Sequence, residues 1–460
     1  MGHDTSASGG TRKMTPDGTN TNFRGLTRPV GLPRIKVDLC SLSAVNCDKV
    51  VFMLTRFYAD NFKCLANVTI EFDRFTALVG PNGAGKSSVL EVLRKLSDLL
   101  TQRGTTEKLF PAESLTRWDT RSEQLFELDV RLSSEGQGTE LLPGGLYRYS
   151  LRLSHDRLRE KNRVAEEKLS FEGKLLYRGW LEPLATAETG SVPNFRAQLF
   201  RDSGAEGPQV LMDWHYSGIA RISSYPDNRL LQRFRRYFEH LVILSINPAS
   251  VTAEARKEQS MVGFDGADFA AWFLYLSHNQ ALACREAERK LQEGVLPGLA
   301  LFQMVSDGAI QVAKAIYQDK GKDLALRLDE LSAGQRAMVI LEHTLAVTKA
   351  WKSSVIIDEP ANFLALAEIQ PLLLRMKNTA DEGEAQVIIT SHHPVAYDLL
   401  AERSGLWLER TPLGATQVKR VSDEIQGAGD SAVPLSELVA RGWVSSGQHQ
   451  NVEAMTSPSR

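Results

Sequence analysis

The chain has 460 residues, 42% hydrophobic and 24% charged, a balance that excludes a collagen-like or wholly disordered protein. Its 54 basic and 56 acidic residues give a formal net charge of −2, so the chain carries no overall basic field to attract nucleic acid. Four scattered cysteines and the lack of a long apolar run predict a cytoplasmic protein with no membrane segment and no disulfide framework.

Residues 1–34 are rich in Gly, Thr, Ser, Pro and Arg and show almost no apolar periodicity. Such a composition cannot offset the entropy of ordering, so residues 1–50 are predicted to be a disordered or non-core extension. A domain-like pattern begins near Met53, and translation from Met53 is an alternative to the printed start. Apolar patterning then predicts strands at 51–57, 68–72 and 75–79 and a helix at 87–100.

Residues 125–224 alternate polar with apolar side chains between Gly/Pro turns, which predicts a β-rich lobe. Helical spacing over 265–318 predicts a module of two or three helices. The last third alternates short apolar strands with helices, which favours a mainly parallel sheet. We therefore divide the folded chain into a first part at 51–250, a helical insertion at 251–325, a second part at 326–445 and a flexible tail at 446–460.

A complete phosphate-loop motif, G-x-x-x-x-G-K-S, lies between the strand at 75–79 and the helix at 87–100. Glycines let the backbone curl so that its N–H groups surround phosphate oxygens at the positive end of the helix. Lys86 is expected to reach the β- and γ-phosphates of ATP, and the Ser87 hydroxyl to bind Mg²⁺. The predicted nucleotide-binding residues here are Gly80, Pro81, Asn82, Gly83, Ala84, Gly85, Lys86, Ser87 and Ser88.

Two later apolar strands end in polar residues suited to the same chemistry. The run SVII ends in Asp358 and Glu359, and ligands sit at the carboxyl edge of open α/β sheets. Asp358 is predicted to hold Mg²⁺ and Glu359 to act as the general base toward the attacking water. His392 follows the strand QVIIT and is predicted to contact the γ-phosphate or that water.

The segments GPNGAGKSS, LSAGQ, VIIDEP and TSHHP occur in the order typical of ABC-type ATPases, and the chain resembles that superfamily, which includes RecF-like, SMC-like and OLD-like proteins. The resemblance implies an α/β P-loop NTPase fold of ABC-ATPase type, with a mixed sheet, a β-rich lobe and a helical insertion. It also implies a head-to-tail homodimer in which each nucleotide lies between one phosphate loop and the partner's LSAGQ signature.

Transferred by position, the resemblance places Ser332, Gly334 and Gln335 at the nucleotide held by the partner. It makes His392 the switch histidine and residues 360–366 the loop that contacts the partner. A magnesium-sensing glutamine is expected before the β-rich strands, and we predict Gln124, with Gln102 as the alternative.

A finer resemblance comes from LSAGQRAMVILEHTLA, DEPANFLALAEIQPLLLRM and PLSELVARGW, which are similar to bacterial AAA-type, ABC-like ATPases of defence and mobile loci. It covers about residues 51–445. Ala361 stands where the family usually has an acidic residue, so the detail of the contact loop is expected to differ.

Three weaker features each keep more than one interpretation. Arg229, Arg233, Arg235 and Arg236 alternate with aromatic residues and either meet a nucleic-acid backbone or form the solvated face of an amphipathic helix, which we favour. Trp118 either stacks on adenine or packs in the core, and packing is favoured. The helices expected at 265–318 fit a lid, a DNA clamp or an oligomer contact.

These features predict an ATPase that converts ATP and water to ADP and phosphate. By resemblance, its role is that of a sensor or regulator in a bacterial anti-phage defence system, controlling a nuclease-like partner encoded nearby. One alternative is a RecF-like protein that clamps DNA for repair. Another is a scaffold that uses ATP only to stabilise its oligomer.

Overall fold

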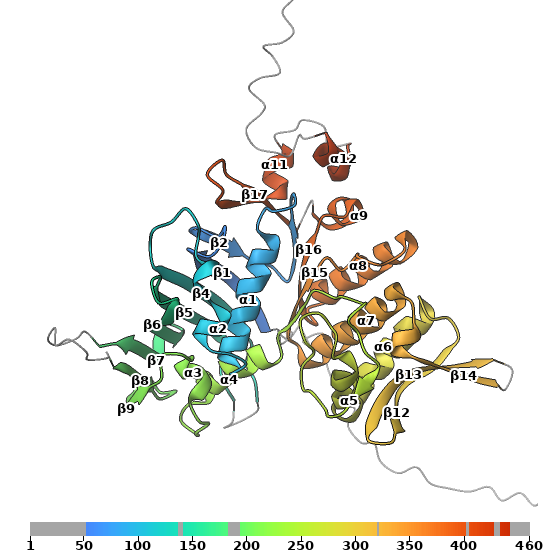
Figure 1. Cartoon of the computed structure of the whole chain (residues 1–460), viewed down its shortest axis with the longest axis horizontal. Helices are drawn as coiled ribbons and strands as arrows, with labels where there is room; N and C mark the ends of the chain where they lie inside the picture. Colours follow the sequence, from blue (N-terminus) through green and yellow to red (C-terminus); the bar gives the residue numbers. More distant parts are fainter. Residues whose placement is uncertain are drawn as a thin grey trace, which may run out of the picture. The chain divides into compact units, whose positions relative to one another are not determined.

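The computed structural model describes residues 52–136, 141–182, 194–319, 322–401, 404–426 and 433–441. The predicted extension at 1–50 and the predicted tail at 446–460 lie outside these ranges. The remaining ranges form one compact unit from residue 48 onward, and the description below is confined to it (Figure 1).

A six-stranded sheet organises this unit, and its strand order is β10-β15-β16-β3-β17-β18. The first five strands are parallel and β18 is antiparallel to β17. The strands are β3 (Phe75–Val79), β10 (Val242–Leu244), β15 (Ser354–Asp358), β16 (Gln386–Ser391), β17 (Gly405–Arg410) and β18 (Thr416–Arg420). The prediction of a mainly parallel α/β sheet is confirmed.

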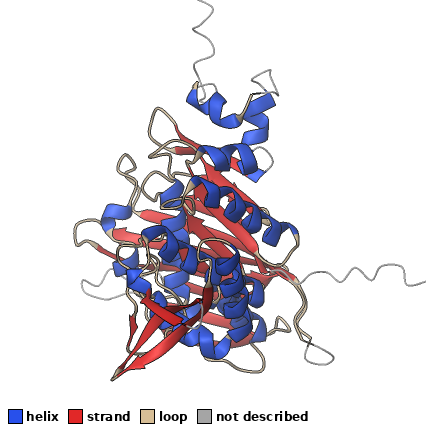
Figure 2. Cartoon of the chain, turned by 90° about the vertical axis from the view of Figure 1, so that its right-hand side faces the viewer, coloured by secondary structure: helices blue, strands red, loops and turns tan. Residues whose placement is uncertain are grey.

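Both faces of this sheet are covered, which explains why its strands are continuously apolar in sequence. Alternate side chains enter two different cores: Val355 and Ile357 join one cluster, whereas Ile356 joins the other. The first core includes α5 (Phe269–Asn279), α7 (Ala333–Trp351) and α8 (Leu366–Asp381), and the second includes α1 (Lys86–Leu100) and α4 (Arg229–Glu239). Figure 2 shows strands of the sheet between helices on either side.

An eight-stranded antiparallel sheet forms the predicted β-rich lobe and packs through the second core. Its strand order is β2-β1-β4-β5-β6-β7-β8-β9. The strands are β1 (Phe52–Asp60), β2 (Val68–Glu71), β4 (Glu123–Leu132), β5 (Gly145–Asp156), β6 (Lys161–Phe171), β7 (Lys174–Leu181), β8 (Phe195–Phe200) and β9 (Glu206–Met212). The alternation seen in the sequence is the in-and-out pattern of these strands.

The insertion predicted to be helical is only half helical, and this prediction was wrong for its second half. After α5 and α6 (Ala281–Glu293), the chain forms β12 (Leu299–Asp307), β13 (Ile310–Asp319) and β14 (Lys322–Arg327). Gly308, with φ of +61°, lies in the two-residue turn between the paired residues Asp307 and Ile310. A glycine in this conformation closes a hairpin, and that signal outweighs the helical spacing. The hairpin is seen at the lower right of Figure 1.

Short elements complete the described chain. They are α2 (Thr106–Leu109), η1 (Ala112–Ser114), α3 (Gly218–Arg221), β11 (Glu254–Ala255), η3 (Leu328–Glu330), α9 (Pro394–Ala396), η4 (Tyr397–Ala401), α11 (Val421–Gln426) and α12 (Leu435–Ala440). None of the helices in the described ranges has the length and apolar character needed to span a membrane.

Candidate nucleotide site

The predicted phosphate loop joins the end of β3 to the start of α1. Gly80, Gly83 and Gly85 adopt φ of +137°, +78° and +111°, in the region that favours glycine. A Cβ on Gly80 would lie 2.1 Å from the carbonyl oxygen of Leu408, and a Cβ on Gly85 would lie 2.4 Å from Oγ1 of Thr416. The loop therefore needs these glycines both for its backbone angles and for its close packing on β17 and β18.

Lys86 is buried at the first position of α1. Its Nζ donates hydrogen bonds to the carbonyl oxygens of Gly80 (2.7 Å) and Pro81 (3.1 Å), at the beginning of the same loop. Burial lowers the pKa of the Lys86 ammonium, and the carboxylates of Glu359 and Asp358 act in the opposite direction. The lysine is thus within electrostatic reach of both predicted strand-end acids.

The other loop residues divide between packing and exposure. Pro81, Asn82, Gly83 and Ser87 are exposed, whereas Ala84 is buried and its carbonyl accepts a hydrogen bond from Thr416 Oγ1 (2.9 Å). Ser88 is half-buried, and its Oγ lies 3.5 Å from the thiol of Cys64. The exposed Ser87 hydroxyl at the start of α1 remains the residue of this loop best placed to meet a metal ion.

Asp358 ends β15 at the carboxyl edge of the sheet. Its Oδ1 accepts a hydrogen bond from Thr390 Oγ1 (2.5 Å), and its Oδ2 accepts one from Ser245 Oγ (3.1 Å). Thr390 belongs to β16, where it pairs with Asp358 of β15 on one side and with Leu78 of β3 on the other. The Thr390 and Ser245 hydroxyls hold the carboxylate in one orientation, and a fixed carboxylate beside hydroxyl oxygens suits a hard cation such as Mg²⁺.

Glu359 and His392 are brought together, as their positions after neighbouring strands predicted. Glu359 Oε1 lies 2.7 Å from His392 Nδ1, and Glu359 Oε2 accepts a hydrogen bond from the His392 amide (3.2 Å). Glu359 has a left-handed φ of +51°, and its own amide is fixed by Thr390. His393 instead caps α9 through its Nδ1, which accepts from the Val395 amide (3.2 Å). His392 is therefore the histidine that faces the acid.

The LSAGQ segment begins α7 with a capping box. Ser332 Oγ accepts from the Gln335 amide (3.2 Å), and Gln335 Oε1 accepts from the Ser332 amide (3.0 Å). A Cβ on Gly334 would lie 2.7 Å from the carbonyl oxygen of Phe363, so the segment packs closely on the loop after Glu359. Within the described chain no hydrogen bond links Ser332 or Gln335 to the phosphate loop. The signature segment and the phosphate loop are therefore not joined by a hydrogen bond in the described chain.

Gln124, predicted to sense magnesium, is a buried structural residue in this structure. Its Nε2 donates to the Asn61 carbonyl (3.0 Å) and to Ser114 Oγ (3.2 Å), and its Oε1 lies 3.0 Å from His155 Nε2. These partners occupy the amide, so Gln124 is not kept among the metal residues. Gln102 follows α1, whose 15 residues place it about 20 Å from Lys86, which excludes it as well.

Polar residues next to β10 and in the β17–β18 hairpin support the site and were not predicted from the sequence. Ser245 comes directly after β10 and reaches Asp358. Arg410 Nε donates to the Gly83 carbonyl (2.6 Å), and Thr416 Oγ1 donates to the Ala84 carbonyl (2.9 Å). A signal existed only for Ser245, which follows a buried strand just as Asp358 ends one.

The arginines of α4 form no free basic surface. Arg233 is buried and pairs with Glu135 at 3.2 Å, and Arg236 pairs with the same carboxylate at 2.9 Å. Arg235 donates to the carbonyls of Ala220 and Ile222. The interpretation of α4 as an amphipathic helix is supported, although these three arginines bind protein groups rather than forming a purely solvated face.

A phosphate loop, an acidic strand end and a histidine at one edge of a parallel sheet define a P-loop ATPase of the AAA/ABC type. Comparison with protein families agrees with this class. The family described as "AAA domain, putative AbiEii toxin, Type IV TA system" matches residues 75–398, from β3 into η4. The chain belongs to this family, and the family indicates ATP as the nucleotide and Mg²⁺ as its usual companion.

Solved structures with some similarity are heads of SMC proteins. The Smc head bound to the C-winged helix domain of ScpA gives a TM-score of 0.43 at 12% identity, over 80% of this chain and 99% of that chain. The SMC head domain from Thermotoga maritima gives 0.34 at 13%, over 80% and 98%. An Smc head with an extended coiled coil, bound to the C-terminal domain of ScpA derived from Pyrococcus furiosus, gives 0.38 at 11%, over 82% and 99%. At these scores the family match alone carries the assignment.

Proposed function

We propose that the protein hydrolyses ATP in composite sites between two copies of the chain and uses closure of this dimer as a switch. The observation that supports the proposal is that no hydrogen bond in the described chain joins its two half-sites. Lys86, Asp358, Glu359 and His392 gather at one sheet edge, whereas Ser332 begins a helix that makes no polar contact with the phosphate loop in the described chain. Each half would be completed by the other half of a second copy.

Within one half-site, each residue has a distinct task. The loop amides and Lys86 would bind the β- and γ-phosphates, and Lys86 would exchange its present carbonyl partners for phosphate oxygens. Ser87 and Asp358 would hold Mg²⁺, which neutralises charge on the phosphates. Glu359 would take the proton of the attacking water, and His392, next to it, would contact the γ-phosphate.

The dimensions of α7 support a signature that acts on a partner. Its 19 residues span about 28 Å, whereas the five residues of β15, two positions further on, span about 17 Å. The start of α7 can thus extend about 10 Å past the strand end that carries Asp358. Nearby, Phe363 is 55% exposed and Leu366 is 73% exposed, on the loop that touches Gly334. Exposed apolar side chains beside the signature suit a surface that a second copy covers.

At the level of the cell, we propose a regulatory role in a bacterial defence or toxin–antitoxin system, with a nuclease-like effector as the controlled partner. The family description, which names a putative toxin of a type IV system, supports this role. A DNA clamp, the RecF-like alternative, is less favoured because the arginines of α4 that could have met a nucleic-acid backbone bind Glu135 and backbone carbonyls.

The composite site can be tested by mixing two inactive variants. Ser332→Arg should block closure and Lys86→Ala should remove phosphate binding, so each homodimer lacks both sites. An equal mixture contains heterodimers with one intact site of two, and about a quarter of wild-type ATP turnover should return if the chains exchange freely. Ser203→Arg, a matched change at another exposed serine, should leave turnover unchanged. Full turnover by the Ser332→Arg homodimer would refute the composite site.

A further inference from the structure

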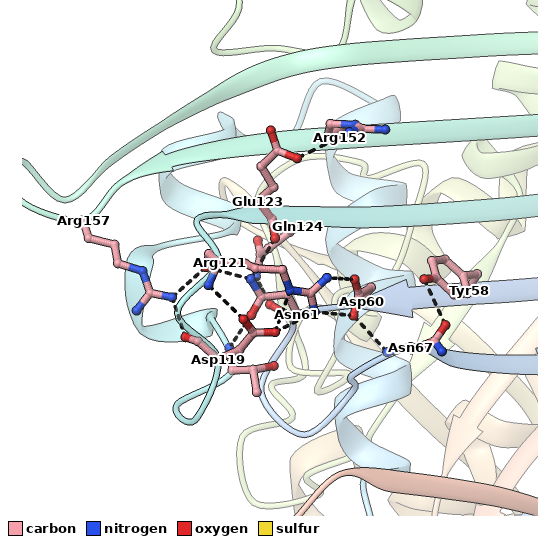
Figure 3. Close-up of polar contacts among 11 residues, drawn as sticks. Tyr58, Asp60, Asn61, Asn67, Asp119, Arg121, Glu123, Gln124, Arg152 and Arg157 are labelled. Carbon is pink, nitrogen blue, oxygen red and sulfur yellow. Dashed lines mark hydrogen bonds and ion pairs between the residues drawn. The ribbon is translucent and has the colours of Figure 1, made fainter.

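Trp118 is held on the surface by a network that does not involve its ring. Arg121 pairs with both oxygens of Asp60 (2.6 and 3.0 Å) and with Asp119 (2.6 and 2.9 Å). Arg157 donates to the carbonyls of Asp119 and Arg121 (Figure 3). These contacts fix the backbone on the C-terminal side of Trp118, yet the tryptophan itself stays 47% exposed. Burial of an indole is energetically favourable, so an exposed indole on a fixed loop is a candidate contact for a ligand.

The covered part of the ring packs on a glycine. A Cβ on Gly414 would lie 3.3 Å from Cζ3 and 3.4 Å from Cη2 of Trp118, so the indole is in close contact with the backbone there. Gly414 has φ of +91° and lies in the turn between β17 and β18. The indole thus has a firm support on the hairpin while the rest of its surface is open to a ligand.

The same hairpin is bonded to the phosphate loop. Arg410 donates from Nη1 to the Gly414 carbonyl (2.5 Å) and from Nε to the Gly83 carbonyl (2.6 Å). Contacts through Gly414 and Arg410 therefore connect the ring of Trp118 to Gly83. The hairpin thus supports both an exposed aromatic surface and the loop predicted to bind phosphates.

We infer that Trp118 is the platform on which the base of the bound nucleoside triphosphate stacks. The inference rests on the proposed nucleotide site and adds the group that binds the base. Aromatic side chains stack on every nucleobase because every base has a π-face, so the platform favours a nucleotide over a bare polyphosphate. It discriminates little among bases, and GTP should bind with an affinity close to that of ATP. The earlier interpretation of Trp118 as a packed core residue is not supported at 47% exposure.

Two substitutions and two ligands test the platform. Trp118→Leu keeps an apolar contact with Gly414 but cannot stack, and Trp118→Phe restores a ring. Titration calorimetry with MgATP should show affinity about 5- to 150-fold weaker in Trp118→Leu and largely recovered in Trp118→Phe. Inorganic tripolyphosphate should bind wild type and both variants equally. Tyr225→Ala, which removes another exposed aromatic side chain, should change neither affinity.

The outcomes separate this inference from the nucleotide site itself. If Trp118→Leu binds MgATP as tightly as wild type while Lys86→Ala does not, the platform is refuted and the phosphate loop stands. Equal losses for MgATP and tripolyphosphate in Trp118→Leu would also refute it, because the loop would then have been disturbed. If wild type binds neither ligand, the proposed function fails and the platform fails with it.

Discussion

Replacement of Glu359 by glutamine separates the chemical step from nucleotide binding. Glu359 Oε1 lies 2.7 Å from His392 Nδ1, and Oε2 accepts from the His392 amide at 3.2 Å. Glutamine has the same size, and its carbonyl oxygen can still accept from that amide. It cannot take a proton from water. The substitution therefore leaves the position of the side chain largely intact and removes the property that a general base needs.

The expected loss follows from the general-base contribution. Removal of such a base costs about 10²–10⁴ in rate, or about 2.7–5.5 kcal/mol of activation free energy. ATP affinity should stay within a few-fold of wild type, because Lys86 and the phosphate loop are unchanged. Phosphate release under steady-state conditions measures the rate, and calorimetry measures the affinity. With the γ-phosphate uncleaved, the closed dimer should accumulate in sizing chromatography with MgATP.

Glu368→Gln is the matched control. Glu368 Oε2 accepts from the Ala365 amide (2.9 Å) at the start of α8, and glutamine can preserve this cap. Its turnover should equal that of wild type. Unchanged turnover in Glu359→Gln would remove Glu359 from the mechanism. A fall in ATP affinity as large as the fall in rate would assign Glu359 to binding instead.

Three other perturbations test the site and the core. Lys86→Ala removes the side-chain charge expected at the terminal phosphates, and ATP affinity should fall about 10- to 150-fold by calorimetry; wild-type affinity would refute the loop assignment. Ser245→Ala removes a donor to Asp358, so the Mg²⁺ concentration for half-maximal turnover should rise about tenfold or more, and an unchanged Mg²⁺ titration would exclude this role. Burial lowers the pKa of His343 from 6.5 to about 4, so as the pH falls this histidine takes up a proton in the unfolded chain before it does so in the folded chain. The free energy of unfolding should therefore fall as the pH is lowered from 6.5 to 4, by about 1.4 kcal/mol per pH unit at most. Urea denaturation of His343→Leu should show a weaker dependence of this free energy on pH, and equal pH dependence in both proteins would contradict the prediction.

The parallel sheet and its edge could be predicted because they depend on local patterns. The strands at 354–358 and 386–391 carry three consecutive apolar residues each, so both of their faces are apolar, as expected for strands between two layers. Strand ends of a parallel sheet meet at one edge, so Asp358, Glu359 and His392 could be grouped before any coordinates. The capping box of Ser332 and Gln335 likewise depends on residues only three positions apart.

The rest depended on contacts that the sequence does not show. The helical spacing seen over 265–318 was misleading for its second part. There the pairing of β12 with β13, rather than the spacing of apolar residues along the chain, determines the structure. Gln124 precedes a strand, as a metal-binding residue could, but its amide is used by Asn61, Ser114 and His155 from three other segments. Only the fold shows which polar side chains already have partners.

The phosphate loop itself illustrates this dependence most directly. Its motif is complete within eight residues, yet its shape is set by a hairpin more than 300 positions later, since Arg410 and Thr416 bind the Gly83 and Ala84 carbonyls. Those carbonyls bind the hairpin, and the Ala84 amide donates to the Pro81 carbonyl (3.3 Å), so the loop is held in a curl in which its other amides can face a ligand. Trp118 rests on the same hairpin through Gly414. Phosphate binding and base binding would thus share one support, and a shift of the β17–β18 turn would affect both ends of the nucleotide together.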